Sequence, residues 1–364
     1  MKILLIGEYS NVHATLAKGL NHLGHETMVV SNGDDWKNYH RDIDVSRTYG
    51  PFGGIKLYAK LLTLLPKLRG FDVVQLINPM FFELKAERLC FFYDYLRRHN
   101  KYVVLGAFGM DYYWVHECIT RFPLRYSDFN IGKHVRTDEE SQRYIRDWVG
   151  TAKGDWCQYV AKDADKIIAG LYEYWACYQP IFPEKTVFCP FPIIPSHTTY
   201  RPFDGKLHLF IGINKTRNRY KGTDIMLKAA QKIVENYPEK ADLQVAESVP
   251  FEDYVKMMAK SDVILDQLYS YTPSMNPLEA MNQGLICVGG GEPENYDIIN
   301  EHELRPIINV ELNESSVYQA LYELILHPER INTLKRESMA YIKRHHDYIN
   351  VAQKYIAFYE QLDH

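Results

Sequence analysis

The chain opens with Lys2-Ile-Leu-Leu-Ile6, continues through Gly7, and then shows helical spacing of apolar residues over His13–Leu23, which ends at Gly24. A short apolar run, a glycine and an amphipathic segment are typical of a strand, a tight turn and a helix in a parallel α/β sheet. Gly24 stands where such a helix is expected to stop. This stretch predicts an α/β fold.

The same alternation runs through the first half of the chain and predicts a parallel sheet with helices on both faces. A helix is expected at Phe82–His99. The further strands are expected at Thr27–Ser31, Val73–Ile77, Tyr102–Ala107, Lys166–Ala169 and Thr186–Cys189.

A proline-rich passage from Pro190 to Pro202 interrupts this alternation, because repeated prolines fix φ and remove N–H donors. The alternation then resumes, with strands expected at Leu207–Ile211, Asp242–Val245, Val263–Leu265 and Leu285–Val288 and helices at Asp224–Asn236, Phe251–Lys260 and Asn276–Gln283. We therefore expect two α/β domains, residues 1–193 and 194–345. The helical segment Ile331–Leu362 closes the second domain, and its last part, residues 346–364, is expected to pack back on the first.

Length and composition exclude several classes of protein. The 364 residues, 46% hydrophobic, favour two domains over one. With 42 Lys and Arg against 46 Asp and Glu, the net charge of −4 leaves no global basic field for nucleic acid. Six cysteines without a C-x-x-C pair indicate neither a disulfide framework nor a zinc cluster, and suit a reducing compartment. Tyrosine is unusually abundant, at 28 residues.

The sequence predicts a cytoplasmic protein. The apolar start is too short for a signal peptide, and no stretch approaches the roughly 18 apolar residues of a spanning helix. The amphipathic segment Lys56–Arg69 leaves peripheral contact with the inner face of the cell membrane open. The alternative for this segment is a core-facing helix with a basic solvated side.

A cluster of cations follows the expected strand Leu207–Ile211. Lys215, Arg217, Arg219 and Lys221 lead to Gly222 at the start of a helix. Lys and Arg donate charge-assisted hydrogen bonds to phosphates, and free N–H groups at a helix start add positive potential. The segment indicates a diphosphate site; the alternative is a solvated basic loop.

A second polar segment follows the expected strand Val263–Leu265. It contains Asp266, Tyr271 and Ser274, and leads to a helix that carries Glu279 in an otherwise apolar turn. A carboxylate at such a place can accept hydrogen bonds from both hydroxyls of a ribose. The alternative is that Glu279 only favours the helix dipole.

Together these segments resemble the GT-B-fold glycosyltransferases, in particular the large retaining family 4. The matching residues are Leu5-Ile-Gly7, Gly24-His25, Arg217 and Arg219 before Lys221-Gly222, and Leu278-Glu279-Ala-Met281 followed by Gly284. The resemblance covers nearly the whole chain and implies two Rossmann-like domains that face each other across a cleft. One position departs from the pattern, because Tyr271 stands where the family usually has a glutamate that contacts the donor sugar.

The resemblance implies transfer of a sugar, with retention of anomeric configuration, from a nucleotide-diphosphate sugar on the second domain to a glycan or lipid-linked acceptor on the first. The setting it implies is the biosynthesis of a surface polysaccharide or another glycoconjugate. Arg219 and Lys221 would stabilise charge on the leaving diphosphate. Asp111 resembles the family's Gly-x-Asp and would orient the acceptor or act as a base; the alternative is a loop-capping aspartate.

The resemblance also implies the binding residues. Donor binding is assigned to Gly7, Lys215, Arg217, Gly222, Asp266, Tyr271, Ser274, Met275, Asn276, Pro277, Leu278 and Glu279. Acceptor binding is assigned to Tyr9, Ser10, Asn11, His13 and Tyr112. For His13 the alternative is that it simply starts the helix.

No cofactor besides the co-substrate and no catalytic metal is expected. The triplets Asp42-Ile-Asp44 and Asp163-Ala-Asp165 do not follow the carboxyl end of a strand, and cationic side chains would take over the role of the metal. Two other functions remain open. A nicotinamide-dependent enzyme would need a G-x-G-x-x-G that is missing after the first strand, and a non-catalytic nucleotide-sugar-binding protein is conceivable because of Tyr271.

Overall fold

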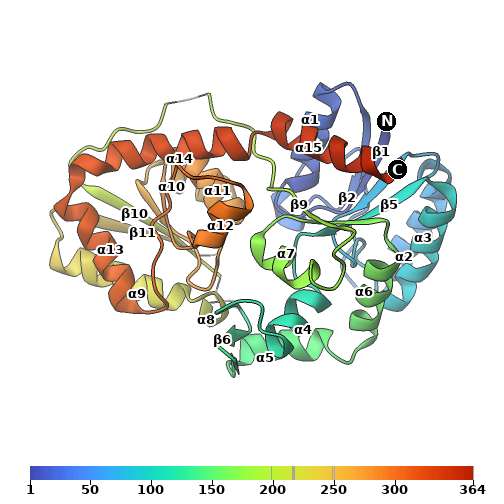
Figure 1. Cartoon of the computed structure of the whole chain (residues 1–364), viewed down its shortest axis with the longest axis horizontal. Coiled ribbons are helices and arrows are strands. Elements are labelled where there is room, and N and C mark those ends of the chain that lie inside the picture. Colours follow the sequence, from blue (N-terminus) through green and yellow to red (C-terminus); the bar gives the residue numbers. More distant parts are fainter. Residues whose placement is uncertain (198, 215–217, 248, 250, 364) are drawn as a thin grey trace. The chain divides into compact units, whose positions relative to one another are not determined.

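The structure is a computed structural model that describes residues 1–363 except 198, 215–217, 248 and 250. The chain forms two compact units (Figure 1). The first unit contains Met1–Pro123, Arg143–Pro192 and Tyr348–His364. The second contains Leu124–Gln142 and Ile193–Asp347.

The first unit is built on a parallel seven-stranded sheet with the order β3-β2-β1-β4-β5-β8-β9. Its central strands are buried on both faces, which explains why they read as continuous apolar runs. The strands are β1 (Lys2–Ile6), β2 (Glu26–Ser31), β3 (Ile43–Asp44), β4 (Val73–Leu76), β5 (Tyr102–Ala107), β8 (Lys166–Ala169) and β9 (Thr186–Phe188).

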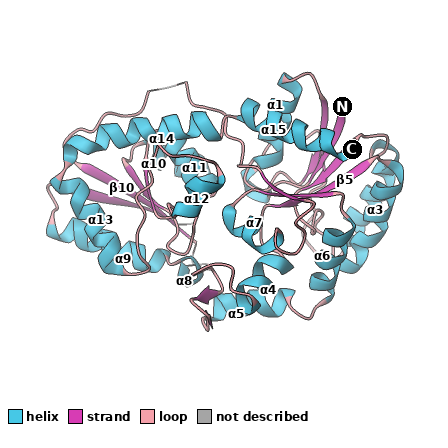
Figure 2. Cartoon of the chain, viewed as in Figure 1, coloured by secondary structure: helices cyan, strands magenta, loops and turns pink. Residues whose placement is uncertain are grey.

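Helices cover both faces of this sheet. Figure 2 shows α1 and α15 on one side and α3 and α6 on the other. The helices are α1 (Val12–His22), α2 (Gly53–Leu64), α3 (Ala86–His99), α4 (Tyr112–Thr120), α6 (Ala152–Asp163), α7 (Tyr172–Tyr178) and α15 (Tyr348–Glu360). Helix α5 (Glu139–Trp148) contains the division between the units.

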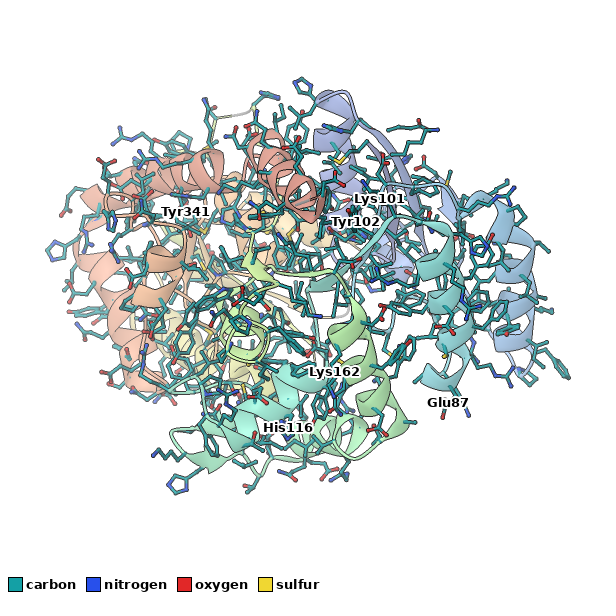
Figure 3. All side chains as sticks on the ribbon, turned by 45° about the vertical axis from the view of Figure 1, so that its right-hand side comes forward. Glu87, Lys101, Tyr102, His116, Lys162 and Tyr341 are labelled. Carbon is teal, nitrogen blue, oxygen red and sulfur yellow. The ribbon has the colours of Figure 1, made fainter. Side chains whose placement is uncertain are left out.

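The C-terminal helix α15 is part of the first unit and packs against α1. Gly19 permits this approach, since a Cβ there would lie 2.4 Å from the carbonyl oxygen of Tyr348. Beyond the helix, Asp363 accepts hydrogen bonds from Lys101 and Tyr102, which Figure 3 labels at the start of β5. Asp363 is therefore bonded to the start of an internal strand of the sheet.

The second unit has a parallel four-stranded sheet with the order β11-β10-β12-β13. The strands are β10 (Leu207–Ile213), β11 (Ala241–Glu247), β12 (Val263–Leu265) and β13 (Ile286–Val288). The helices are α8 (Asn218–Lys221), α9 (Thr223–Asn236), α10 (Phe251–Ala259), α11 (Met275–Asn282), α12 (Pro293–Ile298), α13 (Glu314–Leu326) and α14 (Ile331–His345). A small antiparallel hairpin, β6 (Asn130–Ile131) and β7 (His134–Val135), also belongs to this unit.

The predicted fold class, two parallel-sheet α/β units, is confirmed. Two local features differ from expectation. The expected helix Ile331–Leu362 is two helices, because α14 ends at His345 and α15 begins at Tyr348. Residues 124–142, expected within the N-terminal domain, pack with the second unit.

The segment Lys56–Arg69 lies mainly in α2. Leu57, Leu61 and Leu68 are buried, so this leucine face packs into the core of the first unit. Phe52 and Ile55, at the start of the helix, are exposed. Among the described residues, no helix has both the length and the apolar character that crossing a bilayer requires.

Candidate functional site

In the first unit, the predicted site residues lie in the turn between β1 and α1. Gly7 has φ +85°, and a Cβ there would lie 2.2 Å from Cγ2 of Ile77, so the turn passes tightly over the neighbouring strand. Ser10 and Asn11 also have positive φ, at 51° and 71°. The backbone N–H of Ser10 donates to Asp34 at 2.8 Å. The predicted acceptor residues Tyr9, Ser10 and Asn11 are partly exposed in this turn.

The carboxyl group of Glu8 occupies the N-terminus of α1. Its two oxygens accept hydrogen bonds from the backbone N–H groups of His13, at 3.3 Å, and Ala14, at 2.9 Å. Burial raises the pKa of Glu8 to about 8, against the opposing effect of these hydrogen bonds. The start of α1 is therefore filled by a side chain of the turn itself.

His13 lies beneath the turn, fully buried. Its Nδ1 lies 2.8 Å from the carbonyl oxygen of Gly7, and its Nε2 lies 3.1 Å from Nε2 of Gln75. Tyr359 of α15 donates to the same Gln75 side chain. Burial lowers the pKa of His13 to about 3, so the ring is neutral. These contacts couple the turn to the C-terminal helix.

Asp111 caps the next helix at this edge of the sheet. Its carboxylate accepts from the backbone N–H of Trp114 and from the hydroxyl of Tyr178, both at 2.8 Å, and it is fully buried. Burial raises its pKa to about 6. Tyr112 follows in α4 and stacks on His116, with ring centroids 4.8 Å apart. The geometry of Asp111 is that of a helix cap, which is the alternative given above.

A cavity of about 380 Å³ lies beside the β1–α1 turn, wholly within the first unit. Its lining includes Gly7, Glu8, Tyr9, Asn78, Tyr144 and Trp148. Parallel α/β sheets bind ligands at the carboxyl ends of their strands, and the segments that follow β1 and β4 line this cavity. It is thus a ligand-sized site in the expected place.

In the second unit, the segment after β10 forms a short helix and a tight turn. Of the predicted cations, Arg219 is exposed and Lys221 is partly buried, whereas Lys215 and Arg217 lie outside the described residues. Gly222 has φ +71°, and a Cβ there would lie 2.6 Å from Cβ of Leu268. The backbone N–H of Leu268 donates to the carbonyl oxygen of Lys221 at 2.9 Å. The two segments that the sequence singles out therefore meet.

Asp266 begins the segment after β12 and faces the basic turn. Burial raises its pKa to about 6, while the charge of Lys221 and a hydrogen bond from Asn276 act in the opposite direction. The Asn276 side chain also accepts from the hydroxyl of Tyr254 at 2.9 Å. A carboxylate, an amide and a lysine are thus brought together from three segments.

The start of α11 supplies the remaining predicted donor residues. Ser274, Met275 and Asn276 are partly exposed, whereas Pro277 and Leu278 are buried. Glu279 is partly buried, which raises its pKa, and accepts from Gln283 at 3.3 Å. Its carboxylate retains some access to solvent, as a ribose-binding group requires.

Tyr271 is buried, with 1% of its surface exposed. Its hydroxyl accepts from the backbone N–H of Arg125 at 2.7 Å, and the Arg125 guanidinium lies 5.0 Å from its ring centroid. Arg125 in turn forms ion pairs with Glu292 and Glu294. The glycosyltransferases that the sequence resembles usually have a glutamate at this position. Here the position holds a tyrosine that packs against residues 124–142.

Residues 124–142, which we call the strap, also hold the basic turn. The Arg136 guanidinium donates to the carbonyl oxygens of Arg219 and Tyr220, at 2.8 and 2.9 Å, and lies 4.0 Å from the ring centroid of Tyr269. Glu140 accepts the backbone N–H of Tyr220 at 2.9 Å. The strap could not be predicted from the sequence, because no local pattern links Arg136 to Tyr220, which is 84 positions away.

The two aspartate triplets have structural partners. Asp163 accepts from Tyr93, and Asp165 is bonded by Arg97 and by the backbone N–H of Val103. Asp42 accepts the backbone N–H of Val29, and Asp44 accepts from Arg41. Within the described part of the chain, no three His, Cys, Asp or Glu side chains gather in a way that could hold a metal ion.

Comparison with known proteins identifies the fold. No family model and no curated protein matches the chain. Among solved structures, HepE from Anabaena in complex with UDP-glucose is similar, with 13% identity, a TM-score of 0.60, and coverage of 100% of this chain and 99% of that one. Sucrose-phosphate synthase from Thermosynechococcus elongatus has 12% identity, a TM-score of 0.60, and coverage of 100% and 99%.

A third similar structure is UDP-GlcNAc 2-epimerase from Neisseria meningitidis bound to UDP-GlcNAc. It has 12% identity, a TM-score of 0.54, and coverage of 98% of this chain and 99% of that one. These likenesses extend over nearly the full length of both chains. Two parallel-sheet units in this order, closed by a helix that returns to the first unit, are the GT-B fold.

Proposed function

We propose that the chain is a glycosyltransferase that moves a sugar from a nucleotide-diphosphate sugar to an acceptor glycan or glycolipid. The observation that carries this proposal is the basic turn of the second unit. Arg219 and Lys221 lie in a turn whose Lys221 carbonyl bonds Leu268, beside Asp266 and the start of α11. Cations supported by polar groups at the carboxyl edge of a parallel sheet suit a nucleoside diphosphate.

The second unit would bind the donor. Arg219 and Lys221 would contact the diphosphate and stabilise the charge that develops as the glycosidic bond breaks. Lys215 and Arg217 are proposed to add to this field, and Glu279 to accept hydrogen bonds from the ribose. In this scheme the side chains supply the positive charge, and we propose that the reaction needs neither a metal ion nor a further cofactor.

The first unit would bind the acceptor beside the β1–α1 turn. Tyr9, Ser10 and Asn11 would contact it, and His13 would support the turn from below. Asp111 stays a predicted catalytic group, although both its oxygens are engaged by protein donors. Retention of anomeric configuration and a role in polysaccharide or glycoconjugate biosynthesis are part of the proposal and rest on the family resemblance.

The first experiment is to bind UDP, UMP and uridine to the full chain in a thermal-shift assay. We expect UDP to stabilise the protein most, because the diphosphate reaches the basic turn; a ligand at a hundred times its Kd adds about 2.7 kcal/mol. Turnover is then measured with UDP-glucose and UDP-GlcNAc, with and without EDTA. Equal stabilisation by uridine and UDP would contradict the diphosphate site, and loss of turnover in EDTA would contradict the metal-free mechanism.

A second candidate function is epimerisation of a UDP-sugar, because the similar structures include UDP-GlcNAc 2-epimerase. The two functions separate cleanly by product. Proton NMR of UDP-GlcNAc incubated with the chain alone would show a second UDP-sugar if the chain is an epimerase. A transferase would leave the sugar nucleotide unchanged, or would transfer the sugar to water and release UDP and GlcNAc of unchanged configuration at C2.

We further propose peripheral contact with an anionic membrane through the start of α2. Phe52 and Ile55 are exposed there, next to the exposed Lys56 and Lys60, and apolar side chains beside cations favour an anionic lipid surface. Sedimentation with phosphatidylglycerol vesicles tests this. Phe52→Ser with Ile55→Ser should reduce bound protein several-fold, whereas Trp36→Ser, another exposed ring of this unit, should not.

A further inference from the structure

The cavity of the first unit combines aromatic rings with an excess of carboxylates. Beyond Glu8, its lining includes the acids Asp34, Asp35, Glu83 and Asp147, against the single cation Lys153. Lys37 bonds Asp34 at 2.6 Å, and Lys153 bonds Asp147 at 2.6 Å. Even with these cations counted and Glu8 protonated, carboxylates outnumber positive charges.

One buried donor in the cavity wall has no acceptor. Trp148 is 2% exposed and lines the cavity, and its indole N–H has no hydrogen-bond partner among the described residues. Lys153 covers one face of the Trp148 ring, with Nζ 4.0 Å from the centroid. That face of the ring is therefore closed to a stacking ligand, and the unpartnered N–H is the polar group that the ring offers. Tyr9 and Tyr144, which are partly exposed, also line the cavity.

These groups match a sugar ring. Carboxylates accept hydrogen bonds from hydroxyls, an indole N–H donates to a hydroxyl or ring oxygen, and tyrosine rings pack on C–H faces. The volume of about 380 Å³ lies near the lower end of the roughly 300–1,000 Å³ found for small-molecule pockets. The site thus suits a small ligand rather than a chain of many sugars.

We propose that this cavity binds an uncharged sugar ring of the acceptor and rejects sugars that carry a phosphate or carboxylate. The inference rests on the proposed function for the identity of the ligand as acceptor. A like charge about 4 Å away weakens binding by about fivefold in water and by a larger factor near a protein surface. Exclusion of anionic sugars by tenfold or more is therefore expected.

The test is saturation-transfer NMR of the full chain with methyl hexosides, the matching methyl hexuronates and hexose phosphates. We expect the neutral glycosides to bind at least tenfold more tightly, and the difference to shrink as salt screens the carboxylates. Trp148→Phe, which keeps a ring and removes the donor, should weaken neutral-sugar binding about fivefold, in line with about 1 kcal/mol per hydrogen bond. Asp35→Asn should narrow the discrimination, and Glu87→Gln on the exposed face of α3 should not.

Anionic sugars that bind as tightly as the neutral ones, or an absence of neutral-sugar binding, would overturn the inference. UDP binding, measured on the same samples, separates this outcome from failure of the proposed function. If UDP binds and the neutral and anionic sugars bind equally tightly, the inference alone is wrong. If the neutral sugars bind more tightly than the anionic ones while UDP does not bind, the donor assignment is wrong and the cavity still binds sugars.

A separate observation, the contacts of the strap, carries a second inference. Arg136 bonds two successive carbonyl groups of α8 while its ring contact with Tyr269 holds the guanidinium plane. Its Nε also lies 3.1 Å from Asp138. A planar fork of donors can make these contacts together, and a lysine ammonium cannot.

We infer that Arg136 is a positioning residue that holds Arg219 and Lys221 for the diphosphate. It acts through the backbone of α8 and needs no contact with the ligand. The proposed function enters only in the identity of that ligand. Substitution of Arg136 should therefore lower the affinity for a ligand more, the more phosphate groups the ligand carries. Substitution of an arginine with a purely structural role would not have this effect.

The experiment compares the Kd of UDP and uridine for the wild type, Arg136→Ala, Arg136→Lys and the control Arg336→Ala, an exposed arginine of α14. We expect about a tenfold loss of UDP affinity in both Arg136 variants, less than a twofold loss for uridine, and no change in the control. If Arg136→Ala fails to fold, Glu140→Gln serves in its place, because it weakens the neighbouring contact to Tyr220. It should lower UDP affinity more than uridine affinity, by a smaller factor than the Arg136 variants.

Equal losses for UDP and uridine, or an unchanged UDP affinity in a folded variant, would overturn this inference. If the wild type itself does not bind UDP, the proposed function fails instead.

Discussion

The two units contain the same local design, a parallel strand followed by a tight turn and a helix, and use it with opposite chemistry. Helix α1 follows Asn11 and helix α9 follows Gly222, and both residues have φ 71° and ψ 17°. The backbones enter the two helices in the same way. The side chains in the turns differ completely.

In the first unit the turn supplies its own acid, because the Glu8 carboxyl group bonds the first N–H groups of α1. In the second unit, Arg219 and Lys221 precede the helix, and its N-cap residue, Gly222, has no side chain that could fill the helix start. Asp224 adds one negative charge to the first turn of α9, which the two cations outweigh. A glycine-containing turn before a helix is therefore not enough to make a phosphate site; the side chains decide what the helix start can bind.

Lys221→Ala is expected to have the largest effect, and it tests whether the two turns differ in function. If the basic turn binds the diphosphate, removing one cation should cost about 3–4 kcal/mol of transition-state stabilisation, or roughly a hundredfold to a thousandfold in rate. Donor turnover with UDP-glucose or UDP-GlcNAc measures this. Lys228→Ala, an exposed lysine of α9, is the matched control. An unchanged rate in the Lys221 variant would mean that the two turns do not differ in function.

Glu8→Gln tests the acidic turn. The pKa of Glu8 is raised to about 8, so the folded chain keeps a proton that the unfolded chain releases near 4.5. The free energy of unfolding of the wild type should therefore fall as pH rises from about 4.5 to about 8, by an amount on the order of a few kcal/mol. Glutamine cannot ionise, so the variant should lose this part of the pH dependence.

Melting temperatures between pH 5 and 8 provide the measurement, with Glu87→Gln as control. Parallel pH profiles for the wild type and Glu8→Gln would show that the carboxyl group titrates normally.

Substitutions at Asn11 and Gly222, which share one backbone conformation, are expected to have smaller and unequal effects on stability. Gly222→Ala should lower stability by about 2 kcal/mol, since it combines a left-handed φ with a Cβ 2.6 Å from Cβ of Leu268. Asn11→Gly should change stability by less than about 0.5 kcal/mol, because asparagine and glycine both tolerate this conformation. Chemical denaturation of both variants checks the difference, and equal effects would refute it.

Tyr271→Phe is expected to have the smallest effect. It leaves the backbone N–H of Arg125 without its acceptor and should cost about 1 kcal/mol of stability. The turnover of the folded fraction should stay within about twofold of the wild type if the tyrosine serves packing. A large loss of turnover with unchanged stability would instead support its predicted role in donor binding.

The sequence predicted the sheet well because buried parallel strands are compact apolar runs. The bounds of β5, β8 and β12 agree with expectation at both ends. The two-residue strands β6 and β7 were missed, since a pair of residues shows no periodicity. The break between α14 and α15 falls at the polar residues 343–347; the sequence predicted a change of domain at residue 346 but a helical segment running through it.

For the candidate site, local sequence patterns located the basic segment after β10 and the polar segment after β12. They did not predict the contacts that position these segments. That Leu268 bonds Lys221 is a consequence of strand order, as β10 and β12 are neighbours in the sheet. Other features depend on segments far apart in sequence. They are the burial of Glu8, the cavity wall formed by Tyr144 and Trp148, and the hydrogen bonds from Arg136 to α8. Such contacts become visible only once the topology is known.

The strap also bears on the order in which the molecule can be completed during synthesis. The chain changes unit after residues 123, 142, 192 and 347. The second unit gains its last residues at position 347, and the first lacks α15 until residues 348–360 have been synthesised. Neither unit can therefore finish folding on the ribosome well ahead of the other, and a single cut near residue 193 leaves two fragments that each lack part of their own unit.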